Sequence, residues 1–215
     1  MERPEESHLF MCCTKLREQA FTPIPPGYHL RYCRPEELSL WKDFPFDTQE
    51  QAKEYRPFMD TYFCQTYGKQ QEEFYHSCLF LCDQEDRPLC TGFLWKHYGR
   101  YTTLHWLKTK KEAEGRGLGR AILSEIFGKI KKEDYPIYLH THAGCERAVH
   151  LYTEFGFRIL TKPQEIDGKP NQWKQALDYL QGRMPPAYFS ALSFTEADEN
   201  TQLCNSCLLY TSRCV

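Results

Sequence analysis

The stretch EAEGRGLGRAILSEIF, residues 112–127, places Gly115, Gly117 and Gly119 within five positions and then runs directly into an apolar segment with helical spacing. Backbone N–H groups at the start of a helix carry partial positive charge, and glycines there let an anion approach the backbone closely. A tight turn from a strand into a helix also uses one or two glycines without any ligand. The stretch therefore predicts a strand–turn–helix unit that either receives a phosphate group or only reverses the chain.

Basic residues surround these glycines: Lys108, Lys110, Lys111, Arg116 and Arg120. Positive charge of this density favours a phosphate ligand. No Gly-Lys-Ser/Thr follows, which excludes a Walker loop, and the preceding strand comes too late in the chain for the usual dinucleotide fingerprint. The pattern indicates a phosphate-binding loop of another kind.

The composition is that of an ordinary globular protein. The chain has 215 residues, a formal net charge of −2, and 41% hydrophobic and 26% charged residues, enough for one domain with additions. Such a charge gives no global attraction to nucleic acid or to an anionic membrane. The start, MERPEESHLFMCC, lacks the features of a signal peptide, and no apolar run approaches the ~18 residues of a spanning helix. We therefore predict a cytoplasmic protein with no nucleic-acid or membrane partner.

The eleven cysteines do not form the pattern of a disulfide framework. Most lie inside apolar segments, such as Cys78 and Cys82 in SCLFLC, where reduced cysteine behaves as a small buried hydrophobe. Cys204 and Cys207 make one C-x-x-C, but no second pair with zinc spacing accompanies it. We predict no metal site.

The last residues, CLLYTSRCV at 207–215, have the character of a non-native scar. A DNA sequence that encodes these nine residues can be extended by a stop codon and two further codons. The extended DNA sequence is identical to its own reverse complement. This resembles a transposon end, used to fragment DNA for sequencing, joined to its inverted copy. We therefore exclude residues 207–215 from the predicted fold. On this interpretation the natural sequence can extend beyond Ser206.

Periodicity and turn residues predict the order of elements. Residues 1–27 are predicted to be an N-terminal arm ending in the proline-rich FTPIPPG, and the first strand is predicted at 28–33. Helices are predicted from 34 and over 49–75, followed by strands at 78–83, 90–97 and 101–109. The glycine-led helix is then followed by a strand at 136–142, a helix at 146–155 capped by Gly156, and a strand at 157–160.

This order predicts an α/β (α+β) fold with a mixed, partly parallel central sheet flanked by helices. Residues 163–206 are predicted to be a helical extension with one helix that stops near Pro185 and a shorter one after it. The predicted core domain spans 28–162.

Two motifs in this order resemble the GCN5-related N-acetyltransferase (GNAT) superfamily, over residues 28–161. The family's pyrophosphate loop reads Arg/Gln-x-x-Gly-x-Gly/Ala, and its second motif often reads Asn-x-x-Ala-x-x-Leu-Tyr-x-x-x-Gly-Phe. In this chain the corresponding residues are Glu114, Gly117 and Gly119, and then Cys145, Ala148, Leu151, Tyr152, Gly156 and Phe157.

The resemblance implies an N-acetyltransferase that uses acetyl-CoA as cosubstrate and binds it in a cleft between the central strands. It implies that the diphosphate lies on the loop after the third predicted strand and that the pantetheine arm pairs with that strand. The implied cofactor-binding residues are Trp106, Leu107, Lys108, Gly115, Arg116, Gly117, Leu118, Gly119 and Arg120.

The resemblance also implies a general acid at Tyr152, where many family members carry a tyrosine that protonates the departing thiolate. Tyr152 shares a helical face with Ala148 and Phe155, so simple core packing is the alternative. His140 and His142 lie two apart on one strand face and are candidates for the general base, with His105 and Glu112 as competitors. The sequence leaves the base unassigned.

Two positions depart from the family pattern: Glu114 stands where Arg or Gln is usual, and Cys145 stands for Asn. These departures keep a second hypothesis open, a catalytically inactive acyl-CoA-binding sensor or interaction module. For the enzyme, the partners are acetyl-CoA and an unidentified amine, and the chain is expected to be a monomer or homodimer.

Overall fold

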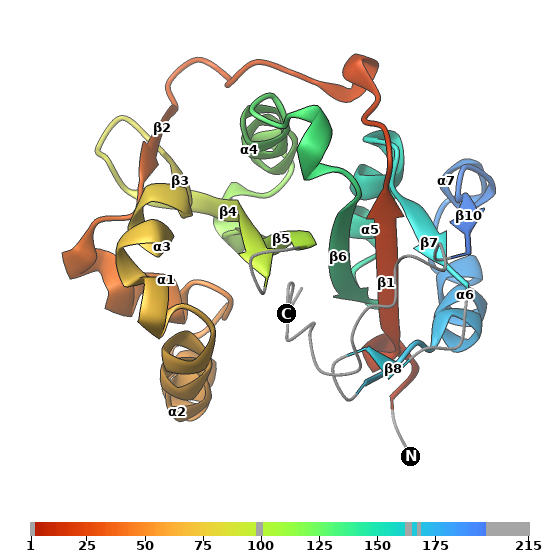
Figure 1. The fold of residues 1–215 in the computed structure, drawn as a ribbon, viewed down its shortest axis with the longest axis horizontal. Coiled ribbons are helices and arrows are strands. Elements are labelled where there is room, and N and C mark those ends of the chain that lie inside the picture. The colour runs from red at the N-terminus through yellow and green to blue at the C-terminus, as the bar shows by residue number, and fades with distance from the viewer. Residues whose placement is uncertain (1–2, 98–100, 162–164, 167–168, 197–215) are drawn as a thin grey trace. The chain divides into compact units, whose positions relative to one another are not determined.

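The computed structural model describes residues 3–97, 101–161, 165–166 and 169–196 (Figure 1). The contacts divide the chain into two compact units. Of the described residues, unit 1 takes in those up to 21, those within 95–105 and those within 129–196, and unit 2 takes in 22–94 and 106–128. Strands β4 (Pro88–His97) and β5 (Tyr101–Thr109) pass through both units.

The strands of unit 2 form an antiparallel sheet. Strand β2 (His29–Tyr32) pairs with β3 (Leu79–Cys82), and β3 pairs with β4. The turn after β3 carries Asp83, whose backbone N–H and C=O bond to Arg87 and Asp86, and this closes the predicted hairpin. Strand β3 is an unbroken buried run, as expected for a strand covered on both faces.

Helices of unit 2 precede and follow this sheet. They are η3 (Pro35–Glu37), α1 (Leu38–Asp43), α2 (Gln49–Thr66), η4 (Gly68–Gln70), α3 (Gln71–Ser77), η5 (Lys111–Ala113) and α4 (Leu118–Phe127). The single helix predicted over 49–75 is wrong, because the chain turns after α2. Tyr67 there is buried and its ring packs against Trp41 and Phe74, so core packing interrupts the helix.

Unit 1 is built on strand β1 (His8–Cys13), which lies between β6 (Ile137–His142) and β7 (Arg158–Leu160) and pairs antiparallel with both (Figure 1). Strand β10 (Phe194–Thr195) pairs parallel with β7, and β5 pairs parallel with β6. The remaining elements of unit 1 are η1 (Pro4–Glu6), η2 (Glu18–Ala20), η6 (Lys132–Asp134), α5 (Glu146–Glu154), β8 (Glu165–Ile166), β9 (Lys169–Pro170), α6 (Trp173–Gln181) and α7 (Pro186–Ser190).

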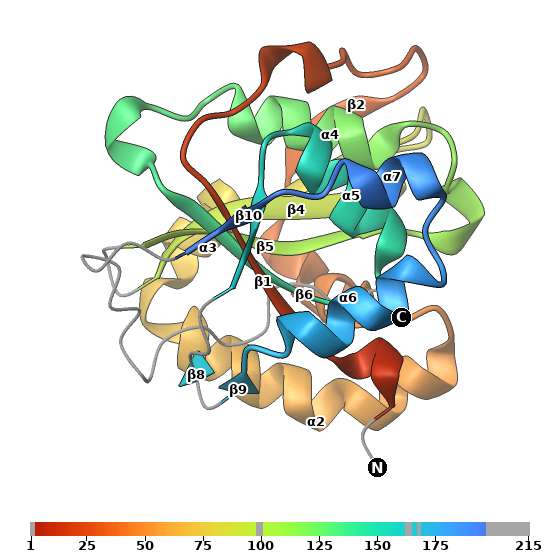
Figure 2. The ribbon, with the colours of Figure 1, turned by 90° about the vertical axis from the view of Figure 1, so that its right-hand side faces the viewer.

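The prediction that the first strand lies at 28–33 is wrong, because β1 precedes it within the predicted N-terminal arm. The residues of β1 from Leu9 to Cys13 are buried, and its partner β6 is far along the sequence. Helix α6 packs against β1 and η1, so the extension beyond the core also contacts this strand (Figure 2). The start of the chain is a central part of the sheet of unit 1.

The predicted fold class is confirmed. The strand order is β10-β7-β1-β6-β5-β4-β3-β2, with parallel pairing at β5–β6 and β10–β7 and helices beside the sheet. The helix predicted to stop near Pro185 is α6, followed by the shorter α7. Residues 197–215, which include the predicted scar and the C-x-x-C, lie outside the described residues.

None of the helices in the described part of the chain combines the length and the apolarity that a membrane span requires.

No disulfide joins the cysteines of the described residues, and burial raises the pKa of the Cys90 thiol to about 12. That thiol is inert at neutral pH, as expected for a cysteine that serves as a core residue.

We predict that Gly156→Ala destabilises the protein by about 2 kcal/mol. Gly156 follows α5 with a φ of +101°, and a Cβ there would lie 2.8 Å from the carbonyl oxygen of Lys15. Urea unfolding measures the change. The matched control is Gly182→Ala at the end of α6, where φ is −82° and the nearest atom would be 3.7 Å away. Equal free-energy changes for the two variants would refute the prediction.

Candidate functional site

The glycine loop of unit 2 connects β5 to α4. Gly115 has a φ of +76° and Gly117, the N-cap of α4, a φ of +79°, a left-handed conformation that favours glycine. A Cβ added to either glycine would meet no atom within 4 Å. The backbone conformation at these two positions therefore favours glycine, although neighbouring atoms leave room for a larger side chain. The backbone of the loop borders open space.

The first N–H groups of α4 have no partner inside the helix, as in every helix. The N-cap Gly117 supplies no side-chain acceptor for them. The helix N-terminus thus presents donors and partial positive charge toward the open side of the loop. This arrangement is suited to the diphosphate that the sequence predicts there.

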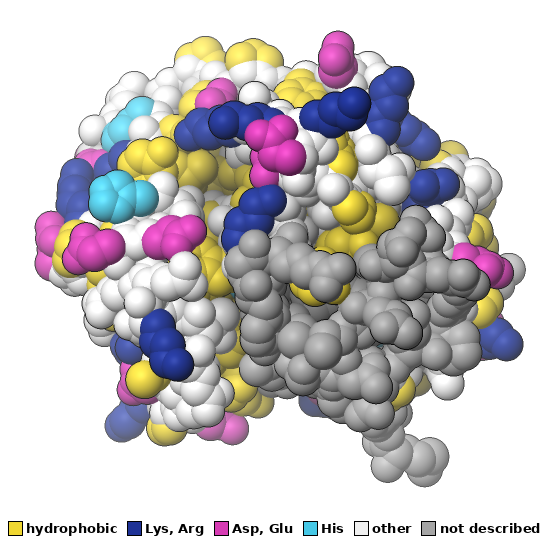
Figure 3. Space-filling view, in the orientation of Figure 1, with side chains coloured by type: hydrophobic (Ala, Val, Ile, Leu, Met, Phe, Trp, Pro, Cys, Tyr) yellow, Lys and Arg dark blue, Asp and Glu magenta, His cyan; other side chains and the backbone are white. Residues whose placement is uncertain are grey.

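Basic side chains accompany the loop, and the space-filling view shows Lys and Arg gathered over α4 (Figure 3). The Arg116 guanidinium donates to the carbonyl oxygen of Glu112 at 2.7 Å and to the Tyr28 hydroxyl at 3.4 Å. Arg116, Lys111 and Glu114 are exposed, and Arg120 is half-buried. The exposed Glu114 leaves the backbone donors of the loop in place.

The predicted pantetheine strand, residues 106–108 of β5, is buried. Trp106 has a φ of +51°, which is uncommon for an aromatic residue, and β5 continues through it. Its ring packs against Trp41 and Tyr62, with centroids 5.8 and 5.3 Å away. The Lys108 ammonium is held 2.8 Å from the Asp47 carboxylate, so its side chain serves an ion pair of unit 2. Only the backbone of this residue remains for the predicted role.

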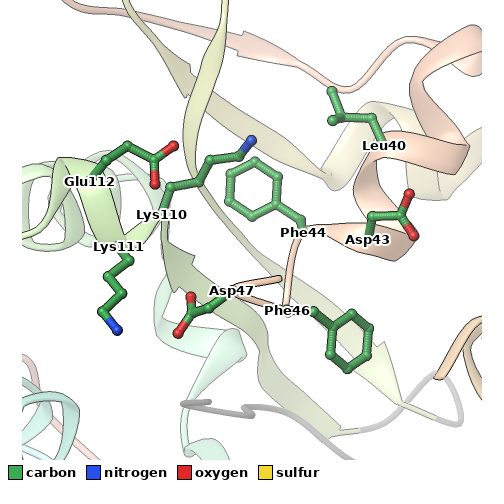
Figure 4. Close-up of a pocket in the computed structure, with 8 residues that line it drawn as sticks. All are labelled: Leu40, Asp43, Phe44, Phe46, Asp47, Lys110, Lys111 and Glu112. Atoms are coloured by element: carbon green, nitrogen blue, oxygen red, sulfur yellow. The ribbon is translucent and has the colours of Figure 1, made fainter. Parts of the chain in front are cut away.

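A pocket of about 120 Å³ lies beside the start of the glycine loop (Figure 4). The Lys110 ammonium lies over the Phe44 ring, 5.3 Å from its centroid. Two of the pocket's carboxylates already have cationic partners, since Asp47 pairs with Lys108 and Asp43 with Arg56. The pocket lining is Leu40, Asp43, Phe44, Phe46, Asp47, Lys110, Lys111 and Glu112.

Tyr152, the predicted general acid, lies on α5 in unit 1. Its side chain is 1% exposed and its ring packs against Phe157 at a centroid distance of 5.9 Å. Its backbone carbonyl accepts a hydrogen bond from the Phe157 N–H at 3.0 Å, which links the end of α5 to the following strand. The side chain is thus rigidly held, which suits both a positioned acid and a core residue.

The two histidines predicted as general-base candidates lie together on β6, with ring centroids 4.9 Å apart. His140 is fully buried and His142 is half-buried. The competitor His105 is buried on β5 and hydrogen-bonds to the Thr103 hydroxyl at 2.7 Å, whereas Glu112 is exposed beside the glycine loop. His142 is therefore the more accessible of the two imidazoles on β6.

The structure adds His8, which the sequence analysis did not single out. The His8 Nδ1 lies 3.0 Å from the His140 Nε2. The sequence does contain one indication of this position, because His8 directly precedes the short apolar run LFMCC. Such a run is typical of a buried strand. The partner strand of that run was not visible in the sequence.

Comparisons with known proteins agree with this fold. Residues 80–165, which hold the glycine loop and Tyr152, match the family model described as FR47-like protein. A GNAT-family acetyltransferase from Colwellia psychrerythraea has a TM-score of 0.50 at 16% identity, over 72% of this chain and 53% of that one. The chain has the fold of the GCN5-related N-acetyltransferases. The resemblance inferred from the two GNAT motifs is confirmed.

Two other acetyltransferase structures have similar TM-scores and sequence identities to this chain. A GCN5-related N-acetyltransferase from Sphaerobacter thermophilus matches with a TM-score of 0.49 at 15% identity, over 73% of this chain and 49% of that one. A GNAT-family acetyltransferase from Staphylococcus aureus Mu50 matches with a TM-score of 0.49 at 13% identity, over 79% and 94%. The chain spans about half the length of the Colwellia and Sphaerobacter proteins. A search of curated protein sequences finds no match.

Proposed function

We propose that this protein is an acetyl-CoA-dependent N-acetyltransferase that transfers an acetyl group to an amine by direct attack. The observation that carries the proposal is the loop at the start of α4, where two glycines with positive φ border open space in a GNAT fold. Its backbone N–H groups and the nearby basic side chains are the donors and charges that a diphosphate requires.

In the proposed reaction the acceptor nitrogen forms a bond to the thioester carbonyl carbon, and the C–S bond then breaks. Tyr152 gives its phenolic proton to the departing thiolate, so CoA leaves as the thiol. The proton lost by the amine passes to a base, for which His140 and His142 are the candidates, directly or through water. Residues 106–108 and 115–120 bind the cosubstrate.

The function is tested by thiol release from acetyl-CoA in the presence of amines, amino acids, polyamines and peptides. Release that depends on one acceptor class, together with mass-spectrometric detection of its acetylated product, supports the enzyme. Release without acceptor would be simple thioester hydrolysis and would contradict it.

One observation favours a second candidate function, an acyl-CoA-binding module without turnover. Tyr152 is 1% exposed, which is typical of a packing residue. Calorimetric titration with CoA separates the two candidates. Tight binding with no product from any acceptor favours the module, whereas the absence of binding rules out both.

We predict that Gly117→Ala weakens CoA binding by about tenfold, because an alanine at a φ of +79° is strained by about 1–2 kcal/mol and the loop leaves its binding conformation. Desulfo-CoA, which retains the diphosphate, should lose the same factor. The control is Gly68→Ala in the same unit, where the nearest atom to a new Cβ is 3.7 Å away and φ is not positive. If Gly117→Ala bound CoA as tightly as the wild type, the loop would be only a turn.

A further inference from the structure

Three histidines from two distant parts of the chain meet on one face of the sheet of unit 1. In the antiparallel register of β1 and β6, His8 lies opposite His142 and Phe10 lies opposite His140. Residues two apart on a strand share a face, so all of these side chains project to the same side. The three imidazoles are therefore neighbours by the geometry of the sheet itself.

The imidazoles of His8, His140 and His142 lie close enough together to be a candidate ligand set. One ring nitrogen from each residue lies within 4.8 Å of the other two. The His8 Nδ1 and the His140 Nε2 are 3.0 Å apart. Two nitrogens on one tetrahedral zinc ion, each at about 2.0–2.1 Å, are separated by about 3.3 Å. One pair is thus close to ligand spacing, and the third nitrogen lies within 4.8 Å of both.

The surroundings hold these rings in place. Phe10 stacks on the His140 ring with centroids 4.6 Å apart, which closes one side of the cluster with an apolar surface. The His8 N–H donates to the Gln172 side-chain oxygen at 2.9 Å, and the Gln172 N–H donates to the His8 carbonyl at 3.0 Å. His8 and His142 are half-buried, so an ion can enter from their side. The cluster is both anchored and accessible.

A second cluster in unit 2, His29, Cys82 and Asp86, has similar spacing but different chemistry. Asp86 forms ion pairs with Arg31 and Arg34, and these contacts lower the pKa of its carboxyl. Burial raises the pKa of the Cys82 thiol to about 11, so this thiol is protonated at neutral pH. Two guanidinium groups and a protonated thiol disfavour a cation. This cluster is an ion-pair network.

We propose that His8, His140 and His142 form a binding site for a divalent transition-metal ion. Neutral imidazoles favour zinc, cobalt, nickel and copper, whereas magnesium and calcium require oxygen ligands. In the metal-free state one of the two nitrogens of the His8–His140 pair donates to the other. The metal takes the place of that proton, which moves to the other nitrogen of its own ring. Three protein ligands leave a fourth coordination position for water or an exchangeable ligand.

Titration of the full chain with Co²⁺ tests this site, followed by visible absorption. We expect one ion per chain with the d–d bands of a tetrahedral site, no near-UV band from thiolate ligands, displacement by Zn²⁺ and no displacement by Mg²⁺ or Ca²⁺. His8→Asn and His142→Asn should each weaken Co²⁺ binding at least about tenfold. His29→Asn is the matched control and should bind as the wild type does.

A measurement on the unmodified protein guards against variants that fail to fold. Co²⁺ at substoichiometric levels should broaden or shift the imidazole NMR signals of His8, His140 and His142 before those of His29 and His76. Absence of binding by the wild type, thiolate bands, or equal broadening of all histidines would overturn the proposal. None of these readouts depends on acetyl transfer, so failure of the metal site is distinguishable from failure of the proposed enzyme. A metal ion bound to His140 and His142 would occupy their basic ring nitrogens and exclude both as the general base of the proposed reaction.

Discussion

We expect the replacement of Tyr152 by phenylalanine to lower kcat by about 10²-fold and to leave CoA affinity nearly unchanged. The substitution keeps the ring and its contact with Phe157, so the buried packing of α5 is preserved. In the proposed reaction, it removes the proton that the thiolate takes up as the C–S bond breaks. A phenol with a reference pKa near 10 keeps its proton at neutral pH and can give it up as negative charge develops on sulfur. Water substitutes in part, which limits the loss.

The experiment uses the acceptor identified by thiol release and single-turnover conditions in which chemistry limits the rate. Tyr138→Phe is the matched control, because Tyr138 is also buried in unit 1 but lies outside the motif of α5. A general acid at Tyr152 requires a large loss of kcat in the first variant and little change in the second. Wild-type turnover by Tyr152→Phe would make this tyrosine a packing residue.

Replacing Trp41 by alanine destabilises the protein by about 3–5 kcal/mol, the largest effect on stability that we expect. Trp41 on α1 is 1% exposed and is the centre of the aromatic core of unit 2. Its ring contacts five others at centroid distances from 4.9 to 6.3 Å, those of Phe63, Tyr67, Phe74, Phe93 and Trp106. Alanine leaves a large cavity in a core that cannot collapse freely around so many rings.

Urea unfolding of the two purified proteins measures this difference in free energy. Trp41→Phe is the control, with an expected loss of about 1 kcal/mol. It retains an aromatic ring and removes an indole N–H that is buried without a hydrogen-bond partner among the described residues. If the alanine variant lost no more stability than the phenylalanine variant, Trp41 would not organise this core.

Elements with a strong local signal could be predicted from the sequence. Strands β3, β4 and β5 are apolar segments separated by turn residues, and the apolar stripe of α4 follows its glycines, so the local sequence predicts all four elements. The left-handed conformation of Gly117 and Gly156 also follows from local chemistry, since few other residues adopt it at a helix end. The predicted phosphate loop therefore needed no knowledge of distant residues.

The interruption of the helix over 49–75 was not predictable in this way. The sequence there predicts one helix, but Tyr67 is buried in the core against Trp41. The φ of +51° at Trp106 is likewise a property of the packed strand, because aromatic residues do not favour that region by themselves. Both features come from burial energy that outweighs local preference.

By itself, the sequence determined the alternation of strands and helices, the glycine loop before α4, and the positions of Tyr152, His140 and His142 on their elements. Only the tertiary structure decided that residues 8–13 form a central strand and that His8 meets His140, which is 132 positions away in the chain. A short apolar run carries no information about its pairing partner, because strand register is set by hydrogen bonds and burial between distant segments. The glycine loop is local and was predictable, whereas the histidine cluster exists only because two strands pair.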